Sequence, residues 1–169
     1  MKPINGVLYN DIGDMGIYVK GKRDGLHRYW YGELPGDKPT YIDRLVARYD
    51  SLNGYSYEDG QLWEESNYKE GKLEGLRRCW HGNGQLMYEK IYKDGKKDGL
   101  SKEWYENGQL ESERNYKDDK KDGLSRGWYE NGQLESERNY KDDKKDGLSR
   151  GWYENGQLES ERNYKDDKK

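Results

Sequence analysis

The chain has 169 residues, about the length of one domain, and 38% of them are charged whereas only 30% are hydrophobic. So polar a chain cannot fill a large aliphatic core, which excludes a compact enzyme, but its 17 Tyr and 6 Trp argue against disorder. The net charge of −3 creates no field that would attract nucleic acid or anionic lipid, and the single Cys excludes an internal disulfide and favours a reducing compartment.

Residues 1–58 are predicted to form degenerate N-terminal repeats, which only the spacing of a few residues reveals. Tyr18, Gly25 and Trp30 are separated by the same intervals as residues of the same types further along the chain, in the regular repeats. The first residues contain no apolar stretch typical of a secretion signal, and no apolar run approaches the ~20 residues that span a bilayer. The sequence therefore favours a cytoplasmic protein.

A loop insertion is predicted within these repeats, at residues 32–40. Tyr31 and Tyr49 lie further apart than the equivalent Tyr105 and Tyr116, and two of the three prolines fall in the extra length. Irregular loops on rigid scaffolds often bind partners, although a neutral insertion explains the sequence as well. The candidate interaction loop comprises Glu33, Leu34, Pro35, Asp37 and Lys38.

Residues 59–169 form regular repeats of about 24 residues each, which are near-identical from residue 104 onward. The segment Trp104–Gly127 is identical, letter for letter, to Trp128–Gly151. A fixed period of this length is the signature of a repeat architecture. With the N-terminal segment, the chain holds about seven units, the first and last of them partial.

Each unit is predicted to be a β-hairpin. Asn131-Gly132 indicates a two-residue type I′ turn between strands at about residues 124–130 and 133–141. The segment Lys-Asp-Asp-Lys-Lys-Asp-Gly is then the longer connection to the next hairpin. Its third position is Gly95 in one copy and Asp143 in a later one, and a left-handed backbone there would cost Asp about 1 kcal/mol relative to Gly.

The predicted fold is all-β: an elongated, single-layer antiparallel sheet of about seven stacked hairpin repeats of about 24 residues. Neither face of such a hairpin is purely apolar, so we expect both faces to contact water. The predicted cross-strand pairs are Gly127–Ser136, Ser125–Arg138, Leu124–Asn139 and Arg126–Glu137, with Trp128–Glu135 and Tyr129–Leu134 beside the turn.

The repeated motif Gly-Leu, Trp-Tyr-Glu-Asn-Gly-Gln-Leu and Tyr-Lys-Asp-Gly-Lys-Lys-Asp-Gly, the last with Asp in place of the first Gly in later copies, resembles the bacterial variant of the MORN repeat (membrane occupation and recognition nexus). The resemblance covers nearly the whole chain and implies hairpin repeats in an elongated, twisted sheet. Many bacterial proteins of this kind are described as antitoxins or immunity proteins, and eukaryotic relatives have been proposed to bind phospholipid and act as scaffolds. The chain departs from the usual pattern in two places: Ser125 and Ser149 replace an aromatic residue, and Arg138 and Arg162 replace glycine.

The sequence contains no constellation typical of catalysis or metal binding. Cys79 and His81 offer two metal ligands, whereas a closed zinc site needs four. We interpret His81 as a substitute for the tyrosine of other copies and Cys79 as a core position. The carboxylates of Glu135 and Glu137 repeat with the unit, so they indicate a salt-bridge ladder rather than a single active site. No enzyme activity, cofactor or metal is therefore expected.

Aromatic residues repeated on hairpins could stack sugars or enclose quaternary ammonium groups, but the sequence favours a structural role, in which they cover glycine and backbone in a fold without a core. The candidate aromatic ladder comprises Trp80, Trp104, Trp128, Trp152, Tyr105, Tyr129 and Tyr153.

The leading functional hypothesis is a non-catalytic scaffold for protein–protein interaction, with an antitoxin or immunity protein that blocks a toxin as one form of it. The alternatives are a module that binds a repetitive ligand, such as glycan or lipid head groups, and a purely structural expanded array. The unit 121–144 has a net charge of −1, which disfavours nucleic acid and anionic lipid. The edge of the last strand offers a route to edge-to-edge self-association.

Overall fold

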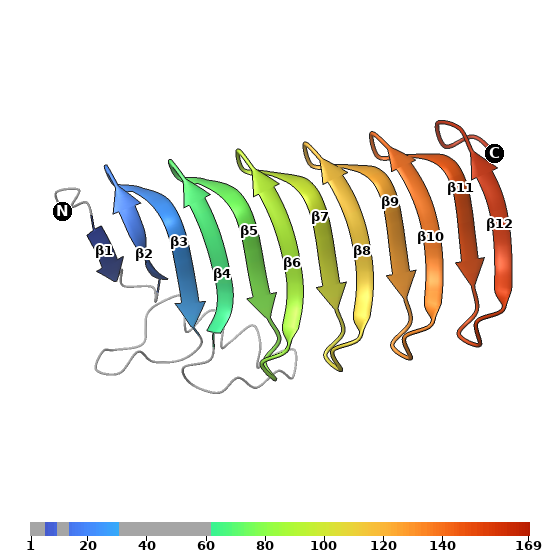
Figure 1. Ribbon diagram of the computed structural model, residues 1–169, viewed down its shortest axis with the longest axis horizontal. Coiled ribbons are helices and arrows are strands. Elements are labelled where there is room, and N and C mark those ends of the chain that lie inside the picture. Colours follow the sequence, from blue (N-terminus) through green and yellow to red (C-terminus); the bar gives the residue numbers. More distant parts are fainter. Residues whose placement is uncertain (1–5, 10–13, 31–61) are drawn as a thin grey trace, which may run out of the picture.

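The computed structural model describes residues 6–9, 14–30 and 62–169, and these form one antiparallel sheet in which the strands follow chain order (Figure 1). The prediction of an all-β, single-layer sheet of hairpin repeats is confirmed. Within the described residues the strands are β1 (Gly6–Tyr9), β2 (Asp14–Val19), β3 (Lys22–Trp30), β4 (Leu62–Lys69), β5 (Lys72–Trp80), β6 (Leu86–Lys93), β7 (Lys96–Trp104), β8 (Leu110–Lys117), β9 (Lys120–Trp128), β10 (Leu134–Lys141), β11 (Lys144–Trp152) and β12 (Leu158–Tyr164).

The two-residue turn of each unit lies in the acidic segment rather than at Asn-Gly. Asp142 and Asp143 join β10 to β11, and both have a left-handed backbone, with φ of 49° and 67°. Positive φ at both central residues is what a type I′ turn requires, and it matches the right-handed twist of the strands. The prediction that this segment forms the longer connection was therefore wrong.

Asn131 and Gly132 lie instead in a five-residue connection, 129–133, between β9 and β10. The Gly132 N–H donates to the Tyr129 carbonyl at 2.8 Å, and the Tyr129 N–H donates to the Gln133 carbonyl at 2.9 Å. Gly132 has φ of 82°, and Asn131 Oδ1 accepts a hydrogen bond from the Gln133 N–H at 2.9 Å. Asn-Gly serves this longer turn, in which only the glycine needs positive φ, as well as it serves a type I′ turn.

The register in the body of the hairpin is as predicted. Gly127 pairs with Ser136, and Ser125–Arg138, Leu124–Asn139 and Arg126–Glu137 also pair. Beside the turn the prediction was wrong: Trp128 pairs with Leu134, because the register shifts by one residue at Glu135. The longer connection and this bulge offset each other, so the other pairs stay where a two-residue turn would place them.

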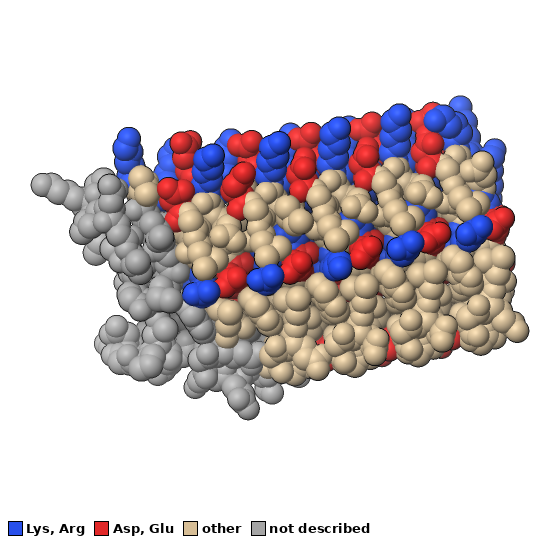
Figure 2. All heavy atoms as spheres, viewed as in Figure 1, with Lys and Arg blue, Asp and Glu red and all other residues tan. Residues whose placement is uncertain are grey.

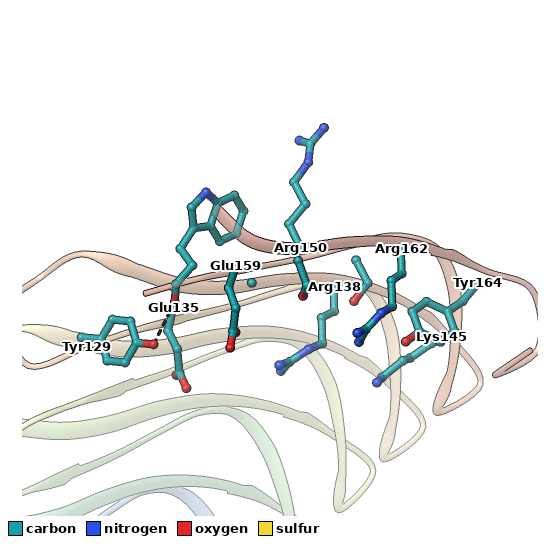
Figure 3. Close-up of a pocket in the computed structure, with 12 residues that line it drawn as sticks. Tyr129, Glu135, Arg138, Lys145, Arg150, Glu159, Arg162 and Tyr164 are labelled. Carbon is teal, nitrogen blue, oxygen red and sulfur yellow. Dashed lines mark hydrogen bonds between the residues drawn. The ribbon is translucent and has the colours of Figure 1, made fainter. Parts of the chain in front are cut away.

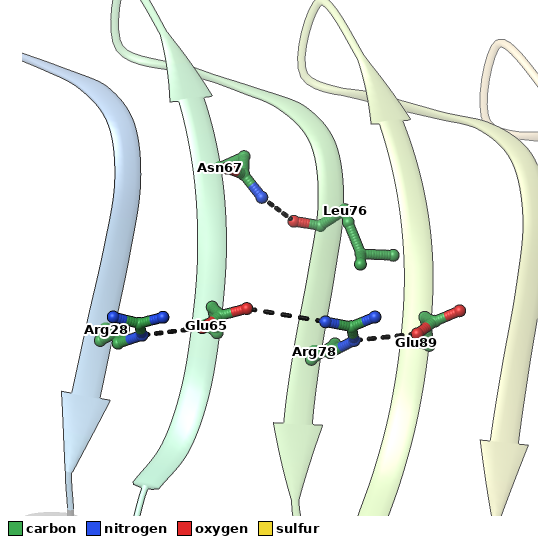
Figure 4. Close-up of polar contacts among 6 residues, drawn as sticks. All are labelled: Arg28, Glu65, Asn67, Leu76, Arg78 and Glu89. Carbon is green, nitrogen blue, oxygen red and sulfur yellow. Dashed lines mark hydrogen bonds and ion pairs between the residues drawn. The ribbon is translucent and has the colours of Figure 1, made fainter.

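A second irregularity occurs in every pair of strands joined by a two-residue turn, such as β10 and β11. The register shifts between Arg138 and Tyr140, so that three residues of β11, centred on Gly147, lie opposite Asn139 alone. Gly147 has φ of 109°, which favours glycine, and the Asn139 amide donates to the Leu148 carbonyl at 3.1 Å. The equivalent contacts are Asn67–Leu76, seen in Figure 4, and Asn115–Leu124, both 2.9 Å. The asparagine satisfies a carbonyl that the bulge removes from the ladder.

Successive turns are hydrogen-bonded to one another along the edge of the sheet. Asp143 Oδ1 accepts from the Lys121 N–H at 2.8 Å, and the Asp143 N–H donates to the Lys121 carbonyl at 2.9 Å. Asp119 makes the same two contacts with Lys97. The cost of a left-handed backbone at these aspartates is therefore offset, because their carboxylates bind the preceding hairpin.

The sheet has almost no apolar core. Among the described residues, the buried hydrophobic side chains are Cys79 and Tyr92. Polar residues are buried in greater number: His27, Glu64, Ser66, Ser101, Ser112, Ser125 and Ser136. The serines are small enough for the Arg, Lys and Tyr side chains of neighbouring strands to lie over them.

β3 pairs directly with β4, although residues 31–61 separate them in sequence. The pairs Gly25–Tyr68 and Trp30–Leu62 repeat the register of Gly75–Tyr92 in the next hairpin. The sheet thus continues from β3 to β4 without a further strand between them, although the sequence that separates them is longer than one 24-residue repeat. The predicted loop at 32–40 and the boundary after residue 58 lie outside the described residues.

In the part of the chain that is described, no helix is long and apolar enough to cross a bilayer.

Candidate functional sites on the two faces of the sheet

One face, called here the tryptophan face, carries Trp80, Trp104, Trp128 and Trp152 near the five-residue connections. Each tryptophan pairs with a leucine of the next strand, as Trp104 does with Leu110 and Trp128 with Leu134. All four tryptophans are half-buried, and the terminal Leu158 is 53% exposed. Figure 2 shows a largely uncharged band along the sheet, below a row of alternating charges.

The row of charges is a ladder of ion pairs that crosses the sheet on the same face. Arg28, Glu65, Arg78 and Glu89 alternate over four neighbouring strands, with N–O distances of 2.8, 3.7 and 2.9 Å (Figure 4). The ladder continues through Lys102–Glu113, Arg126–Glu137 and Arg150–Glu161. The predicted pairing of Arg126 with Glu137 is confirmed. Such partly exposed pairs contribute a few tenths of a kcal/mol each and leave little net charge on this face.

The tyrosines of the predicted aromatic ladder are not part of this band. Tyr105 and Tyr129 donate their hydroxyls to the carbonyls of Trp128 and Trp152 in the next hairpin, both at 2.8 Å. Burial, with the nearby Glu111 and Glu135 carboxylates, raises the pKa of Tyr105, so its phenol stays protonated as a donor. These phenols therefore hydrogen-bond adjacent repeats to each other.

His81 and Cys79 occupy structural positions. His81 Nε2 lies 2.8 Å from the Trp104 carbonyl, which places the imidazole where later repeats have the tyrosine hydroxyl. Cys79 is 3% exposed, and burial raises the pKa of its thiol to about 11, so it remains protonated at neutral pH. No cluster of three metal-ligating side chains occurs among the residues that the structure describes. The candidate loop residues 33–38 lie outside that part of the chain, and Tyr153, in the last hairpin, is 50% exposed.

The opposite face, called here the serine face, carries Ser101, Ser112, Ser125 and Ser136 together with basic residues outside the ladder, among them Arg138 and Lys121. Three lysines lie over tyrosine rings, each with the ammonium 5.0 Å from the ring centre: Lys97 over Tyr116, Lys121 over Tyr140, and Lys145 over Tyr164. Cation–π contacts of this kind fix the lysines beside the neighbouring arginines.

Carboxylates of the chain neutralise this face in the earlier repeats. Glu64 pairs with Arg77 at 2.6 Å and accepts a hydrogen bond from the Ser66 hydroxyl. Glu103 lies between Lys90 at 2.8 Å and Arg114 at 2.7 Å. Burial alone would raise the pKa of Glu103, but hydrogen bonds from the two basic groups outweigh it and lower the pKa to about 2.

The last two repeats have pockets at the corresponding place. Gly127 and Gly151 pair with a serine of the next strand, as Glu103 does in the preceding repeat. A cavity of about 160 Å³ lies above Gly127 and one of about 230 Å³ above Gly151. In Figure 3, which shows the larger pocket, the carboxylates of Glu135 and Glu159 lie at one end and the basic side chains of Arg138, Arg162 and Lys145 at the other. Sequence reasoning missed these pockets, although the replacement of Glu103 by glycine is visible once the repeats are aligned.

Comparison with known families supports the repeat assignment. The chain matches the MORN repeat variant over residues 55–70, 73–94, 97–118, 121–142 and 145–166, which together exceed half of its length. The last four segments coincide with the strand pairs β5–β6, β7–β8, β9–β10 and β11–β12. No curated protein matches the chain significantly. The family match and the stacked hairpins agree, and the chain belongs to the MORN repeat variant family.

Proposed function

We propose that the protein is a non-catalytic scaffold that binds a protein partner through its tryptophan face. The observation that carries this proposal is the row of half-buried Trp side chains, each paired with a leucine of the next strand, over which the described part of the chain places no second layer. Contiguous apolar surface rimmed by polar residues is typical of protein interfaces, and tryptophan is enriched at their centres. The ion-pair ladder, which includes Arg126 and Glu137, forms such a rim along one side.

A toxin is the specific kind of partner that the resemblance to bacterial MORN variants favours, which would make the protein an antitoxin or immunity protein. In that form the band would cover a surface of the toxin and block it by occlusion, so the scaffold would need no chemistry of its own. A rigid sheet also suits this role because its contact residues are held in place before binding.

The alternative is a repetitive ligand, such as a glycan, bound along the tryptophans. The spacing of equivalent tryptophans on alternate strands, ~9.6 Å, favours this reading. Leucines separate the tryptophans, however, and the nearby phenols of Tyr105 and Tyr129 already donate to the backbone. The polar groups that border the indole rings belong to the ion-pair ladder and already pair with one another, which supports a protein ligand over a glycan.

The test is affinity capture from a lysate of the source organism. We expect the double substitution Leu110→Lys/Leu134→Lys to lose the stoichiometric partner that the unaltered chain captures, because it places two charges in the band. Gln109→Lys/Gln133→Lys is the matched control, since both glutamines are exposed and adjoin the same leucines. Circular dichroism verifies that both variants fold. Equal capture by the two variants would contradict the proposal.

The same capture assay tests the predicted interaction loop. Replacement of residues 32–40 by Asn-Gly is expected to abolish capture if Glu33, Leu34, Pro35, Asp37 and Lys38 contribute the contact, and to leave it unchanged if the band suffices. Removal of residues 121–144 distinguishes the alternative, because a repetitive ligand would lose affinity stepwise with each unit removed.

A further inference from the structure

The serine face contains a carboxylate site that the chain fills itself in one repeat. Lys90, Glu103 and Arg114 lie on the neighbouring strands β6, β7 and β8, and the Glu103 carboxylate contacts both basic groups. The Ser112 hydroxyl donates to the same carboxylate at 3.2 Å. Two basic side chains and a serine hydroxyl thus form a site that binds a carboxylate.

The next two repeats keep the cations and the serines but lack the carboxylate. Gly151 lies between Arg138 and Arg162, and neither arginine has an ion-pair partner within the described part of the chain. The backbone does not demand glycine here, because Gly127 and Gly151 are outside the left-handed region. A Cβ at Gly127 would lie 3.2 Å from Ser136 Oγ, a tight contact but one that the hydroxyl can relieve by rotating. Glycine therefore opens space at a position that the preceding repeat fills with the side chain of Glu103.

An unsatisfied hydroxyl lines the smaller pocket. Ser125 is only 9% exposed, and its Oγ is the one buried side-chain polar atom without a hydrogen-bond partner among the described residues. It lines the cavity above Gly127 together with Arg138 and Lys121. A buried hydroxyl without a partner costs about 1–3 kcal/mol, which an acceptor entering the cavity would recover.

From these observations we infer that the serine face binds the side-chain carboxylates of an acidic, extended segment of a protein partner, one in each pocket. Each carboxylate takes the place that Glu103 takes in the preceding repeat, between two arginines. Glu135 Oε2 and Glu159 Oε2 lie 3.4 Å from where a Cβ at Gly127 and at Gly151 would stand, and they repel a second negative charge, so the site favours a monoanionic carboxylate held on the arginine side of the pocket. The inference rests on the proposed function insofar as the ligand belongs to a protein, but it uses the opposite face.

The spacing of the pockets specifies the form of the segment. Equivalent positions on alternate strands lie ~9.6 Å apart. A polyproline II helix repeats every three residues with a rise of ~3.1 Å per residue, so side chains three residues apart lie on one side, ~9.3 Å from each other. The pockets above Gly127 and Gly151 therefore fit acidic residues at every third position of such a segment.

A synthetic peptide tests the inference on the full-length chain. The probe is a fluorescein-labelled peptide of four Glu-Pro-Pro triplets, and binding is measured by fluorescence anisotropy at low ionic strength. We expect it to bind at least about tenfold more tightly than a Gln-Pro-Pro peptide or a peptide with the same number of glutamates at every fourth position.

Variants of the chain locate the site. Arg138 borders both pockets, so Arg138→Met is expected to weaken binding of the peptide by about tenfold or more. Arg150→Met is the matched control, because Arg150 points to the other side of the same strands (Figure 3), where it pairs with Glu161. Gly127→Glu/Gly151→Glu supplies internal carboxylates and is expected to abolish binding. Glu103→Gly opens a third pocket and is expected to tighten binding severalfold.

Three results would overturn the inference: no difference between the two glutamate spacings, equal loss in Arg138→Met and Arg150→Met, or competition by inorganic phosphate stronger than competition by acetate. None of them bears on the capture assay with Leu110 and Leu134, which concerns the tryptophan face. Failure of the inference and failure of the proposed function are therefore separate outcomes.

Discussion

A single register position shows how much one residue changes in this sheet. Cys79, Glu103, Gly127 and Gly151 occupy the same position in four successive repeats. The first is a buried thiol, the second an ion-paired carboxylate, and the glycines lie under open pockets. The backbone is equivalent in each case, so the side chain alone decides whether the site is filled. Function can thus differ between repeats while the fold does not.

The position of Ile91 provides a test of the asparagine contact at the bulge. Ile91 stands where Asn67, Asn115 and Asn139 donate to a carbonyl, and it is 39% exposed. We expect Ile91→Asn to raise the free energy of unfolding by about 1 kcal/mol, because it gives the Leu100 carbonyl a donor. The reverse change, Asn115→Ile, should lower it by about 1–2 kcal/mol. Urea denaturation measures both, and an Ile91→Asn variant less stable than the parent would refute the role of the amide.

The pKa of Glu103 makes a prediction about pH. Its pKa in the folded state, about 2, is lower than in the unfolded chain, so the charged group stabilises the fold above pH ~4.5. This contribution is lost as the pH falls from ~4.5 towards 2. The parent should exceed Glu103→Gln in stability by on the order of 1 kcal/mol at pH 7, after allowance for solvent screening, and the two should converge near pH 2. Thermal unfolding at several pH values measures this, and a difference that does not change with pH would contradict the assignment.

The elements of the fold were predicted better than their connections. The constant repeat length and the alternation of side chains along a strand determined which residues pair, so Gly127–Ser136 and Arg126–Glu137 followed from the sequence. The turn assignment failed because Asn-Gly is compatible with two hairpin geometries. The aspartate turn depends on a contact between Asp143 and Lys121, which belong to different hairpins, and no local rule includes such a contact.

Substitution of Asp143 separates the two contributions to that turn. Asp143→Ala keeps a residue with a Cβ in the left-handed conformation but removes the acceptor for the Lys121 N–H. We expect a loss of about 1–2 kcal/mol in stability. Asp143→Gly, which relieves the strain while losing the same bond, should lie within about 0.5 kcal/mol of the parent. Equal losses from both substitutions, measured by urea denaturation, would show that the left-handed backbone carries no strain for the carboxylate contact to offset.

At the scale of the whole molecule, the repeat determines the form of the sheet, and no second layer of described residues covers either face. The single layer followed from the sequence because neither side of a hairpin is apolar enough to need cover. The direct pairing of β3 with β4 did not follow from the sequence, because the sequence between the two strands preserves part of the repeat spacing. The pockets of the serine face were also missed, because they combine residues from three neighbouring strands and depend on an absent side chain at Gly127 and Gly151.

Small-angle X-ray scattering of the full chain and of a variant lacking residues 121–144 tests the central claim most directly. This segment is identical to residues 145–168, so its removal preserves every junction. In a single-layer stack, each unit adds two strands of ~4.8 Å, so the deletion should shorten the maximum dimension by ~10 Å while the cross-section stays constant. A uniform contraction in all directions, with a narrower cross-section, would show that the units pack in more than one layer and would contradict the account.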